Sequence, residues 1–554
     1  MKILILGGYG TFGGRLAQLL ADDPRLTLLI AGRSLAKAQA FCKKLPAGAE
    51  KLALTFDRNQ EIEPQLRTTQ PDLVVDATGP FQIYGDDPYR MIKACLATQV
   101  NYMDLADGSE FVKQVDQFDA EAKARNIYIL SGVSSFPVLT AAVVRRLTND
   151  WSKVNTIRGG IAPSPYAGVG LNVIRAITSY AGQRLPLVHA GEPSFGYALT
   201  ETMRCTVGPP GYVPLKNTLF SLVDVPDLRV LPELWPEVEE VWMGAGPVPE
   251  ILHRMLIGLS WLVRRGLLPT LLPFAALFHF VINILRWGEH RGGMFVAVQG
   301  LDKSGNPIEH SWHLLAEGND GPFIPSMAIE ALVKRALKGT SSVPGARPAT
   351  TDLELEDYEE VFQHRTIYTG QRADSETISQ PIYQNLLGSA WDALPEPIQK
   401  LHTCKEASGA ADIDVSQNVL ARLASKLLGF PAPGKEVPVR ISFEATPGRE
   451  VWHRKFGKTS FETIQTAGQG RADKLLSEAF GPIGVDFALV VSGERLHLVP
   501  RRWSLLGIPM PLALAPIGST YEYVKDGKFH FHVEMTFPWG SPLIRYQGWL
   551  VPIS

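Results

Sequence analysis

The feature that most constrains this chain is a glycine-rich turn that follows a short apolar run at its start. Residues 2–6 read KILIL, a helical leucine pattern spans residues 12–22, and a second apolar run spans residues 26–31. Between the first run and the helix lie three glycines in the spacing G-x-G-x-x-G, at Gly8, Gly10 and Gly13. This order of strand, glycine turn, helix and strand predicts the first βαβ unit of a dinucleotide-binding sheet.

Each glycine has a mechanical reason in such a unit. Gly8 permits the tight turn off the strand, Gly10 carries no Cβ that would obstruct a diphosphate, and Gly13 lets helix and strand pack closely. The free N–H groups of the helix N-terminus then face the phosphates. We therefore expect the diphosphate of a dinucleotide to bind at Gly8, Tyr9, Gly10, Thr11, Phe12 and Gly13.

The end of the second strand indicates which dinucleotide is held. A site for NAD(H) places an acidic residue there for the ribose 2′-hydroxyl, whereas an arginine accommodates the 2′-phosphate of NADP(H). Here the strand ends in Arg33 and Ser34, with no acid. This favours NADP(H) over NAD(H). The alternative is that Arg33 is only a solvated loop charge.

Alternating strands and helices continue to about residue 135 and predict a doubly wound Rossmann sheet. The expected strands are residues 51–56, 72–76, 101–105 and 128–131, and the expected helices are residues 86–98 and 109–125. Asp57 follows the third strand and would border the adenine. Small residues after the fourth strand let the chain pass the nicotinamide half of the cofactor, namely Ala77, Thr78, Gly79 and Pro80.

Hydride transfer also needs a group that exchanges a proton with the substrate. The residues expected near the nicotinamide are Tyr84, Tyr102, Asp104 and Asp107. The alternative is structural: the tyrosines pack and the aspartates cap helices. No Ser-His-Asp or Cys-His set is evident, and no lysine stands four residues after Tyr102.

Composition limits the class of protein. With 554 residues the chain exceeds the roughly 250–300 residues that one core serves. A net charge of -2 argues against a nucleic-acid partner. The four cysteines form no CxxC pair, which predicts neither a disulfide framework nor a metal site and fits a reducing compartment. The apolar run at residues 3–6 is too short for a signal peptide, so we expect a cytoplasmic protein.

The middle of the chain contains a conspicuous hydrophobic segment at residues 251–285. Residues 266–285 carry no Asp, Glu, Lys or Arg, which meets the length of a membrane span, although Pro269 and Pro273 interrupt it. Three interpretations stay open: a buried core or oligomer interface, an interfacial helix or lip in peripheral contact with a membrane, and a true span. Around it we expect a strand at residues 151–161, a helix at residues 171–181 and a hairpin of residues 293–301 and 309–316.

The C-terminal third is predicted to be a separate domain. Residues 339–352 are dense in Gly, Pro, Ser and Thr, residues 351–380 read as a linker, and residues 381–428 read as helical. Strands are expected at residues 437–444, 450–456, 487–492, 495–499, 520–524 and 528–537. In the last strand His530, His532 and Glu534 share one face, which we interpret as a solvated face rather than a metal site. A curled sheet around an apolar cavity that captures a ligand is a further hypothesis.

Several segments resemble the saccharopine dehydrogenase-like oxidoreductases. They are GGYGTFGGRLA near Gly7, DLVVDATGPFQIYG from Asp72, NYMDLADG from Asn101, SGVSSFP from Ser131, VPLKNTLFSLVDVPDLRVLP from Val213 and LAEGNDGPFIPSMAIEALVKRAL from Leu315. The likeness covers about residues 1–350. WHRKFG at Trp452 and YQGW near Tyr546 resemble an uncharacterised domain that is fused to this family in bacterial chains.

The resemblance implies NADP-linked redox chemistry without settling the substrate. Members include lysine-pathway reductases, polyamine-forming enzymes and lipid-associated proteins. Amino-acid members would need arginines for carboxylates, for which Arg158, Arg175 and Arg204 are available. The hydrophobic excess instead favours an apolar or amphiphilic carbonyl, imine or enoyl compound. The alternatives are a non-catalytic NADP(H)-binding sensor or membrane scaffold, and a saccharopine- or polyamine-type reductase.

The expected fold class is α/β with three parts. A Rossmann domain spans residues 1–135, an α+β substrate and dimerisation domain spans residues 136–350, and a β-rich α+β domain spans residues 381–554. A helix at residues 325–338 is expected to pack back on the Rossmann domain. The expected partners are a small, lipid-like molecule and a second copy of the chain.

Overall fold

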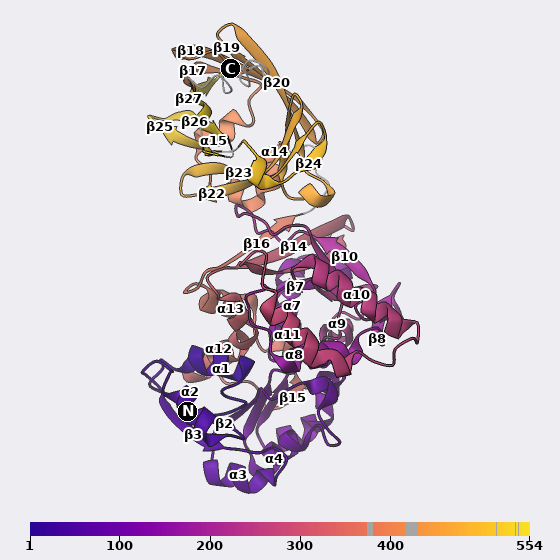
Figure 1. The fold of residues 1–554 in the computed structure, drawn as a ribbon. Coiled ribbons are helices and arrows are strands. Elements are labelled where there is room, and N and C mark those ends of the chain that lie inside the picture. The colour runs from indigo at the N-terminus through magenta and orange to yellow at the C-terminus, as the bar shows by residue number, and fades with distance from the viewer. Residues whose placement is uncertain (374–380, 417–429, 517, 538, 541, 554) are drawn as a thin grey trace. The chain divides into compact units, whose positions relative to one another are not determined.

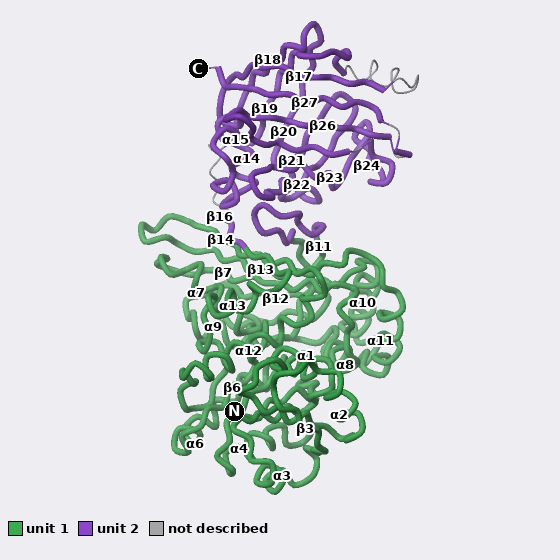
Figure 2. The backbone as a smooth tube through the Cα atoms, turned by 90° about the vertical axis from the view of Figure 1, so that its left-hand side faces the viewer, with its two compact units in different colours: residues 1–205, 218–369 green, residues 206–217, 370–554 purple. Residues whose placement is uncertain are grey.

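The computed structural model divides the chain into two compact units (Figure 2). Unit 1 comprises residues 1–205 and 218–369, and unit 2 comprises residues 206–217 and 370–554. The structure describes all residues except 374–380, 417–429, 517, 538, 541 and 554. Residues 206–217 thus belong to the C-terminal unit, which the sequence did not indicate.

The first layer of unit 1 is a seven-stranded sheet in which every adjacent pair is parallel. Its order is β15-β6-β5-β4-β1-β2-β3, so the strand order reverses between β4 and β1. Residues 3–5 of β1 are fully buried, as expected for a strand with helices on both faces. The strands are β1 (Lys2–Leu6), β2 (Thr27–Gly32), β3 (Glu50–Thr55), β4 (Leu73–Asp76), β5 (Asn101–Asp104), β6 (Tyr128–Ser131) and β15 (Gly345–Pro348). The predicted doubly wound Rossmann sheet is confirmed.

Two features of this layer differ from the prediction. The Gly/Pro-rich composition of residues 339–352 predicted a loop, but Gly345–Pro348 within this segment form strand β15. The strand forms because it pairs in parallel with β6. The single helix predicted at residues 109–125 is divided into α5 (Ser109–Lys113), a 3-10 turn (Gln114–Phe118) and α6 (Asp119–Ala124). The other helices of the layer are α1 (Thr11–Leu20), α2 (Leu35–Cys42), α3 (Ile62–Thr69) and α4 (Arg90–Thr98).

Helix α12 (Ile324–Leu337) returns to the Rossmann layer from the far end of unit 1. The Ser326 hydroxyl donates a hydrogen bond of 3.2 Å to the carbonyl oxygen of Phe12, in the first turn of α1. Residues 324 and 327–329 are buried in this contact. The expected packing of residues 325–338 against the Rossmann domain is confirmed.

The second layer of unit 1 is a mixed sheet in the order β10-β11-β12-β7-β13-β14-β16. Its members are β7 (Trp151–Ala162), β10 (Thr202–Cys205), β11 (Thr218–Leu222), β12 (Glu240–Ala245), β13 (Gly292–Asp302), β14 (Pro307–Ala316) and β16 (Ile367–Ala373). A further hairpin, β8 (Arg184–His189) with β9 (Glu192–Tyr197), joins it at β12. The predicted hairpin of β13 and β14 is confirmed, with Gly292 opposite Ala316.

Four further helices of unit 1 belong to the same part of the chain as this sheet, namely α7 (Thr140–Thr148), α8 (Leu171–Tyr180), α9 (Asp227–Leu234) and α13 (Leu355–Phe362). Residues 351–369 are therefore structured parts of unit 1 rather than a linker. One face of α13 is apolar and buried, although the segment as a whole is rich in acidic residues, which is why the composition suggested a linker. The buried residues are Leu355, Tyr358, Val361 and Phe362.

The hydrophobic segment 251–285 forms two short helices, α10 (Glu250–Arg264) and α11 (Ala275–Ile284), which Figure 1 shows beside α8. Gly266, with a φ of +73°, follows the end of α10, and Pro269 lies in the segment between α10 and α11. Within the described part of the chain, no helix has the length and apolarity to cross a membrane. The side chains on the outward faces of both helices are exposed, so the interpretation of this segment as a buried core is wrong for those side chains.

Unit 2 contains one eleven-stranded antiparallel sheet that closes on itself, because β22 pairs with both β21 and β23. Its strands are β17 (Glu406–Val415), β18 (Gly434–Thr446), β19 (Arg449–Phe456), β20 (Thr459–Ala467), β21 (Leu476–Phe480), β22 (Ile483–Ser492), β23 (Arg495–Leu505), β24 (Ile508–Met510), β25 (Thr520–Lys525), β26 (Lys528–Thr536) and β27 (Pro542–Pro552). The β-rich prediction is confirmed.

The helix predicted at residues 381–428 is correct only for its beginning. The structure contains α14 (Ile382–Leu387) and α15 (Glu396–Leu401), whereas residues 406–415 form β17, between β18 and β27. Gly409 permits the close pairing of β17 with β27, since a Cβ there would collide with the carbonyl group of Trp549 on β27. The rest of the prediction, residues 417–428, lies outside the described residues.

Helices α14 and α15 and large aromatic side chains fill the interior of this closed sheet. Tyr383 stacks on His402 with ring centroids 3.7 Å apart, and Trp452 lies 6.1 Å from Tyr383. His402 is buried and contacts the carboxylate of Glu522 at 2.7 Å. These side chains belong to the hydrophobic core of unit 2, and the hypothesis of an apolar cavity inside this sheet stays a prediction.

The histidines of β26 contact neighbouring strands. The rings of His532 and Tyr521 stack at 4.8 Å, and those of His530 and Tyr523 lie 5.2 Å apart. Over the described ranges no group of three or more His, Cys, Asp or Glu side chains is arranged for a metal ion.

Candidate functional site

The glycine turn has the geometry of a diphosphate cradle. Its left-handed residue is Gly7, with φ +70°, rather than Gly8, and the Gly10 N–H donates to the carbonyl oxygen of Gly7 at 2.7 Å. A Cβ on Gly8 would lie 2.8 Å from the carbonyl oxygen of Ile5. A Cβ on Gly13 would come well inside 3.0 Å of Gly7. Gly8 and Gly13 therefore serve close packing, and Gly7 makes the turn.

Helix α1 begins directly after this turn, and its N-terminus is uncapped. Gly10 is the N-cap residue in an extended conformation, no side chain caps the helix, and the first turn contains no acidic residue. The first N–H groups of a helix have no intrahelical partner and favour an anion. The residues present therefore fit the diphosphate of a dinucleotide.

The turn opens into a cavity of about 1220 Å³ within unit 1. The loops that follow β1 to β6 all contribute to its wall, as expected for ligands at the carboxyl ends of a doubly wound sheet. The lining residues from these loops include Gly7, Tyr9, Gly10, Thr11, Phe12, Arg33, Asp57, Arg58, Ala77, Thr78, Gly79, Pro80, Tyr84, Asp107 and Ser134.

At the end of β2, Tyr9 and Arg33 line the cavity and Ser34 does not. The Tyr9 ring lies on Gly32, where a Cβ would come within 2.7 Å of it, and its hydroxyl accepts a hydrogen bond of 3.1 Å from the Ser34 N–H. The Ser34 hydroxyl accepts from the Lys37 N–H and caps α2. Arg33 is exposed and, in the part of the chain that is described, has no ion-pair partner.

The loop after β4 is braced by a buried polar network. Asp76 is fully buried and accepts from the Thr78 N–H at 3.0 Å, from the Thr78 hydroxyl at 2.6 Å and from the Tyr84 hydroxyl. Arg58 lies 3.4 Å from the centre of the Tyr84 ring and donates to the Tyr84 carbonyl oxygen at 2.7 Å. Burial raises the pKa of Tyr84 well above its usual value. Tyr84 lines the cavity, but its hydroxyl is engaged by Asp76.

Tyr102 and Asp104, the other two residues predicted for catalysis, do not line the cavity. Both are fully buried in β5. Asp104 accepts hydrogen bonds from the N–H groups of Ala106 and Gly132 and from the Ser131 hydroxyl at 2.8 Å, and burial raises its pKa to about 7. These contacts connect the ends of β5 and β6, which gives Asp104 a structural role.

Asp107, Tyr180 and Asp224 form a polar group in the cavity wall. Burial, with the negative charge of Asp224 as a lesser cause, raises the pKa of Asp107 to about 6. Burial also raises the pKa values of Asp224 and Tyr180. The neighbouring Gly108 packs on the backbone of Phe81 and Gln82, which places this group beside the loop after β4. Sequence reasoning identified Asp107 but missed Tyr180, the last residue of α8, and Asp224, which follows β11.

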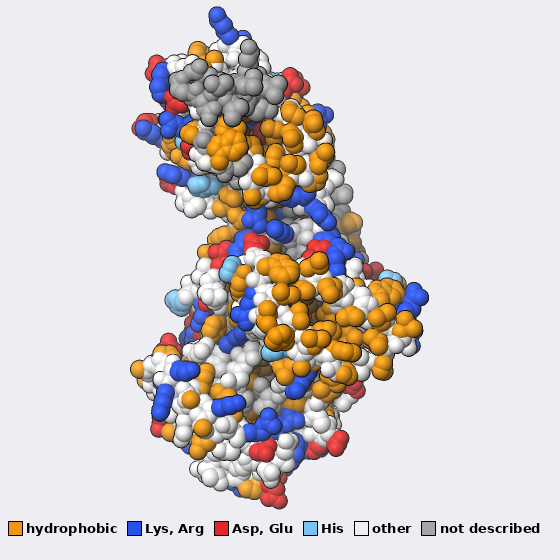
Figure 3. Space-filling view, in the orientation of Figure 1, with side chains coloured by type: hydrophobic (Ala, Val, Ile, Leu, Met, Phe, Trp, Pro, Cys, Tyr) orange, Lys and Arg blue, Asp and Glu red, His pale blue; other side chains and the backbone are white. Residues whose placement is uncertain are grey.

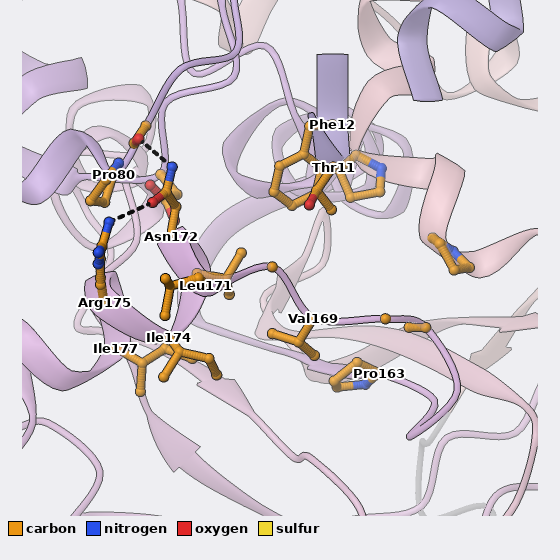
Figure 4. Close-up of a pocket in the computed structure, with 18 of the residues that line it drawn as sticks. Thr11, Phe12, Pro80, Pro163, Val169, Leu171, Asn172, Ile174, Arg175 and Ile177 are labelled. Carbon is orange, nitrogen blue, oxygen red and sulfur yellow. Dashed lines mark hydrogen bonds between the residues drawn. The ribbon is translucent and has the colours of Figure 1, made fainter. Parts of the chain in front are cut away.

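The opposite wall is predominantly apolar and comes from α8, α10 and α11, and Figure 4 shows the part formed by α8. In Figure 4, Thr11 and Phe12 lie on one side of the cavity and Val169, Leu171 and Ile174 on the other. Its lining residues include Leu171, Ile174, Ile177, Leu252, Met255, Leu256, Leu259, Leu277, Phe278, Val281, Ile282 and Leu285.

The segment before α8 fastens this wall to the Rossmann layer. The Asn172 side chain donates to the Gly79 carbonyl oxygen at 2.8 Å, and Arg15 donates to the Ala167 carbonyl oxygen at 2.7 Å. At Gly170 a Cβ would lie 2.7 Å from the Thr11 hydroxyl oxygen. The cavity is therefore enclosed between the glycine turn and α8.

Two family models match the chain. The saccharopine dehydrogenase NADP binding domain matches residues 3–130, and a domain of unknown function matches residues 394–550. Both matches agree with the resemblance seen in the sequence. No curated protein matches the chain.

Solved structures of dehydrogenases are similar to parts of the chain at low identity. Saccharopine dehydrogenase (L-Glu forming) from Saccharomyces cerevisiae has 14% identity and a TM-score of 0.47, covering 68% of this chain and 100% of that one. A meso-dapdh mutant with DAP from Clostridium tetani has 14% identity and a TM-score of 0.32, covering 66% and 98%. The WlbA dehydrogenase from Thermus thermophilus, in complex with NAD and alpha-ketoglutarate, has 12% identity and a TM-score of 0.29, covering 62% and 90%.

The glycine cradle, the strand order and the family models agree on the nature of the first domain. The chain is thus similar to the saccharopine dehydrogenase NADP binding domain over residues 3–130 and to a domain of unknown function over residues 394–550.

Proposed function

We propose that the protein is an NADP(H)-dependent oxidoreductase that acts on an apolar or amphiphilic carbonyl, imine or enoyl compound. The observation that carries the proposal is a single cavity with a dinucleotide cradle in one wall and three apolar helices in the other. Its volume of about 1220 Å³ exceeds the usual range of about 300–1,000 Å³ for one small ligand. This leaves room for a second molecule beside the cofactor.

The preference for the phosphorylated cofactor is supported by Arg33. Its exposed guanidinium lies at the end of β2, where the ribose 2′ position of a dinucleotide is read. The described residues place no Asp or Glu of the β2 end in the cavity wall at this position. An arginine in this place supplies charge-assisted hydrogen bonds to a phosphate.

Proton exchange is assigned to Asp107. When bound, the nicotinamide supplies or accepts a hydride at the substrate carbon. In the reducing direction, the protonated Asp107 carboxyl group would give its proton to the oxygen or nitrogen of a carbonyl or imine, or to the α-carbon of an enoyl compound, and in the oxidising direction the carboxylate would take it back. A pKa of about 6 suits both directions near neutral pH. Tyr180 and Asp224 would position the polar end of the substrate.

The apolar wall distinguishes this proposal from a saccharopine- or polyamine-type reductase. A substrate with several carboxylates needs converging arginines, but Arg158 is paired with Glu240 at 3.0 Å and Arg204 with Glu250 at 2.5 Å. Of the three arginines considered, Arg175 alone lines the cavity. A non-catalytic NADP(H) sensor is less well supported, because the space beside Asp107 is open rather than filled.

Cofactor choice is tested by calorimetric titration of the purified full chain with NADPH and NADH. We expect tighter binding of NADPH, and Arg33→Ala should weaken NADPH by about 10-fold or more while leaving NADH nearly unchanged. Arg67→Ala, which removes an exposed arginine outside the cavity, is the matched control. Equal losses for both cofactors with Arg33→Ala would contradict the assignment.

Substrate class is tested by the oxidation of NADPH in the presence of straight-chain aldehydes and 2-enals from butanal to dodecanal. An apolar wall predicts that kcat/KM rises with chain length by about fourfold for each methylene, until the cavity is full, since each contributes about 0.8 kcal/mol. A flat profile, together with turnover of amino-acid imines, would favour the amino-acid reductase instead.

A further inference from the structure

The outward faces of α10 and α11 are apolar, where a helix of a water-exposed surface normally presents polar side chains. On α10, Ile251 and Met255 are 59% and 61% exposed, and on α11, Phe280 and Ile284 are 61% and 60% exposed. Figure 3 shows the hydrophobic side chains gathered over these helices. We call this surface the α10–α11 face; its exposed residues are Ile251, Met255, Trp261, Leu262, Leu267, Phe274, Leu277, Phe280, Ile284, Leu285 and Trp287.

The spacing shows that both helices turn an apolar stripe outward. Ile251, Met255 and Leu262 follow one another at intervals of one and two helical turns, and Leu277, Phe280 and Ile284 follow one another at intervals of one turn each. The inward side of α10 buries His253, Ser260 and Val263, and other side chains of the helix line the cavity, among them Leu256 and Leu259. Burial of the core therefore does not account for the outward hydrophobicity.

Positive charges predominate along this face. Residues 251–288 contain four arginines and no Asp or Glu, while Glu250 and Glu289 at its two ends are paired with Arg254 and Arg291. Arg265 and Arg286 are exposed at the ends of the face, and Arg265 lies 5.5 Å from the Trp261 ring. An apolar surface bordered by arginine and tryptophan is complementary to a bilayer with anionic headgroups.

The face is also continuous with the cavity. Met255, Leu277 and Leu285 line the cavity and are at the same time exposed to solvent, at 61%, 55% and 37%. At these three side chains the apolar cavity wall thus extends directly to the outer surface. A molecule that leaves a bilayer through this face would stay in contact with apolar side chains on its way into the cavity.

We propose that the α10–α11 face docks on an anionic lipid bilayer and admits amphiphilic molecules from it to the cavity. The helices are 15 and 10 residues long, which corresponds to about 22 and 15 Å, whereas a bilayer core measures about 30 Å. The helices would therefore lie in the interface with their apolar stripes in the headgroup region. Docking does not depend on redox activity, whereas the delivery of a substrate rests on the function proposed above.

The docking is tested by flotation of the full chain with vesicles of phosphatidylcholine containing phosphatidylglycerol, and with vesicles of phosphatidylcholine alone. We expect binding to the anionic vesicles, and Phe280→Glu with Ile284→Glu should reduce the bound fraction about tenfold or more. Neither side chain lines the cavity, so NADPH binding should be unchanged in the same preparation. Val343→Glu, at an apolar side chain that is 71% exposed elsewhere in unit 1, is the matched control.

The charge contribution has its own variant. Arg265→Glu with Arg286→Glu should weaken binding to the anionic vesicles several-fold and remove its dependence on salt. Wild-type protein that binds NADPH but remains unbound with both kinds of vesicle would overturn the docking and leave the proposed function intact. A dimer that dissociates in the Phe280→Glu and Ile284→Glu variant, without vesicle binding, would also overturn it and would assign the face to a second copy of the chain.

Discussion

The interiors of the two units differ. In unit 1, the carboxyl ends of six parallel strands and three helices surround a cavity of about 1220 Å³. In unit 2, side chains of α14, α15 and the closed sheet pack into one hydrophobic core, with Tyr383 and Trp452 only 5% or less exposed. The closed sheet of unit 2 thus surrounds packed side chains, whereas the parallel sheet of unit 1 borders a cavity.

Two buried carboxylate sites, one in each unit, differ in their hydrogen bonding. Asp107 and Asp224 of unit 1 face a cavity, and one carboxylate oxygen of Asp224 has no hydrogen-bond partner in the described structure. In unit 2, the Glu450 carboxylate accepts from the Ile382 N–H and from the Trp452 indole N–H, both at 3.2 Å. Unpaired polar groups at a cavity are available for a ligand, whereas paired ones stabilise the fold.

The largest expected effect is on catalysis in unit 1. Asp107→Asn removes the proposed proton donor, and kcat with the best aldehyde should fall by about 10²–10⁴-fold. In the wild type, the raised pKa keeps Asp107 protonated below pH 6, so the rate of reduction should be highest there and fall about tenfold per pH unit above it. Stopped-flow measurement of NADPH oxidation between pH 5 and 8 tests both expectations.

The comparison provides the control for this variant. Asp104→Asn changes a buried aspartate that does not line the cavity, and the rate of reduction should keep its dependence on pH. A pH profile that disappears with Asp104→Asn but persists with Asp107→Asn would reverse the two roles.

The sequence could not separate these two aspartates. Asp104 lies near the end of the fifth expected strand and Asp107 follows it, so both stand where a doubly wound sheet places catalytic groups. What distinguishes them is tertiary: the backbone N–H of Gly132, in the loop after β6, binds the carboxylate of Asp104. Asp224 and Tyr180, which complete the polar group, come from the second layer, and no local pattern connects them with Asp107.

The next effect concerns the filled interior of unit 2. Trp452→Ala empties a buried site and removes the indole N–H from Glu450, so unfolding of unit 2 should become easier by about 3–5 kcal/mol. The affinity of unit 1 for NADPH should not change. Guanidinium denaturation followed by circular dichroism, with NADPH titration on the same sample, measures both quantities.

Trp539→Ala is the matched substitution, because Trp539 is 64% exposed, and we expect a change below about 0.5 kcal/mol. If Trp452→Ala instead leaves stability unchanged and abolishes NADPH binding, the separation between a binding unit and a filled unit is wrong.

A smaller effect is expected at the glycine cradle. Gly13→Ala brings a methyl group against Gly7, and the resulting displacement should weaken NADPH binding by about 30-fold, or roughly 2 kcal/mol. Gly258→Ala, at a helical position of α10 where a Cβ would meet nothing within 4 Å, should leave binding unchanged. Calorimetry on both variants makes the comparison; equal behaviour would exclude the cradle as the diphosphate site.

The cradle was predictable from the sequence because all of its determinants are local. The apolar run, the three glycines and the helix they begin lie within residues 2–20, and the hairpin of β13 and β14 is similarly contained in residues 292–316. Strand β15 was not predictable, since it pairs with β6 across more than 200 residues of chain. The same holds for residues 206–217, where the Val491 N–H donates to the Gly211 carbonyl oxygen from a distant strand.

The smallest effect distinguishes a buried pair from an exposed one within unit 2. His402 and Glu522 are in contact at 2.7 Å with side-chain exposures of 0% and 10%, whereas His453 and Glu462 are in contact at 2.8 Å with exposures of 33% and 65%. Glu522→Gln should lower the free energy of unfolding by about 1–2 kcal/mol, because a weaker acceptor then faces a buried imidazole. Glu462→Gln should change it by less than about 0.5 kcal/mol, since water screens the exposed pair. Denaturant titration measures both, and neither variant should alter NADPH affinity if the buried polar groups of unit 2 serve its fold alone; a loss of affinity with Glu522→Gln would show that this interior contributes to the function of unit 1.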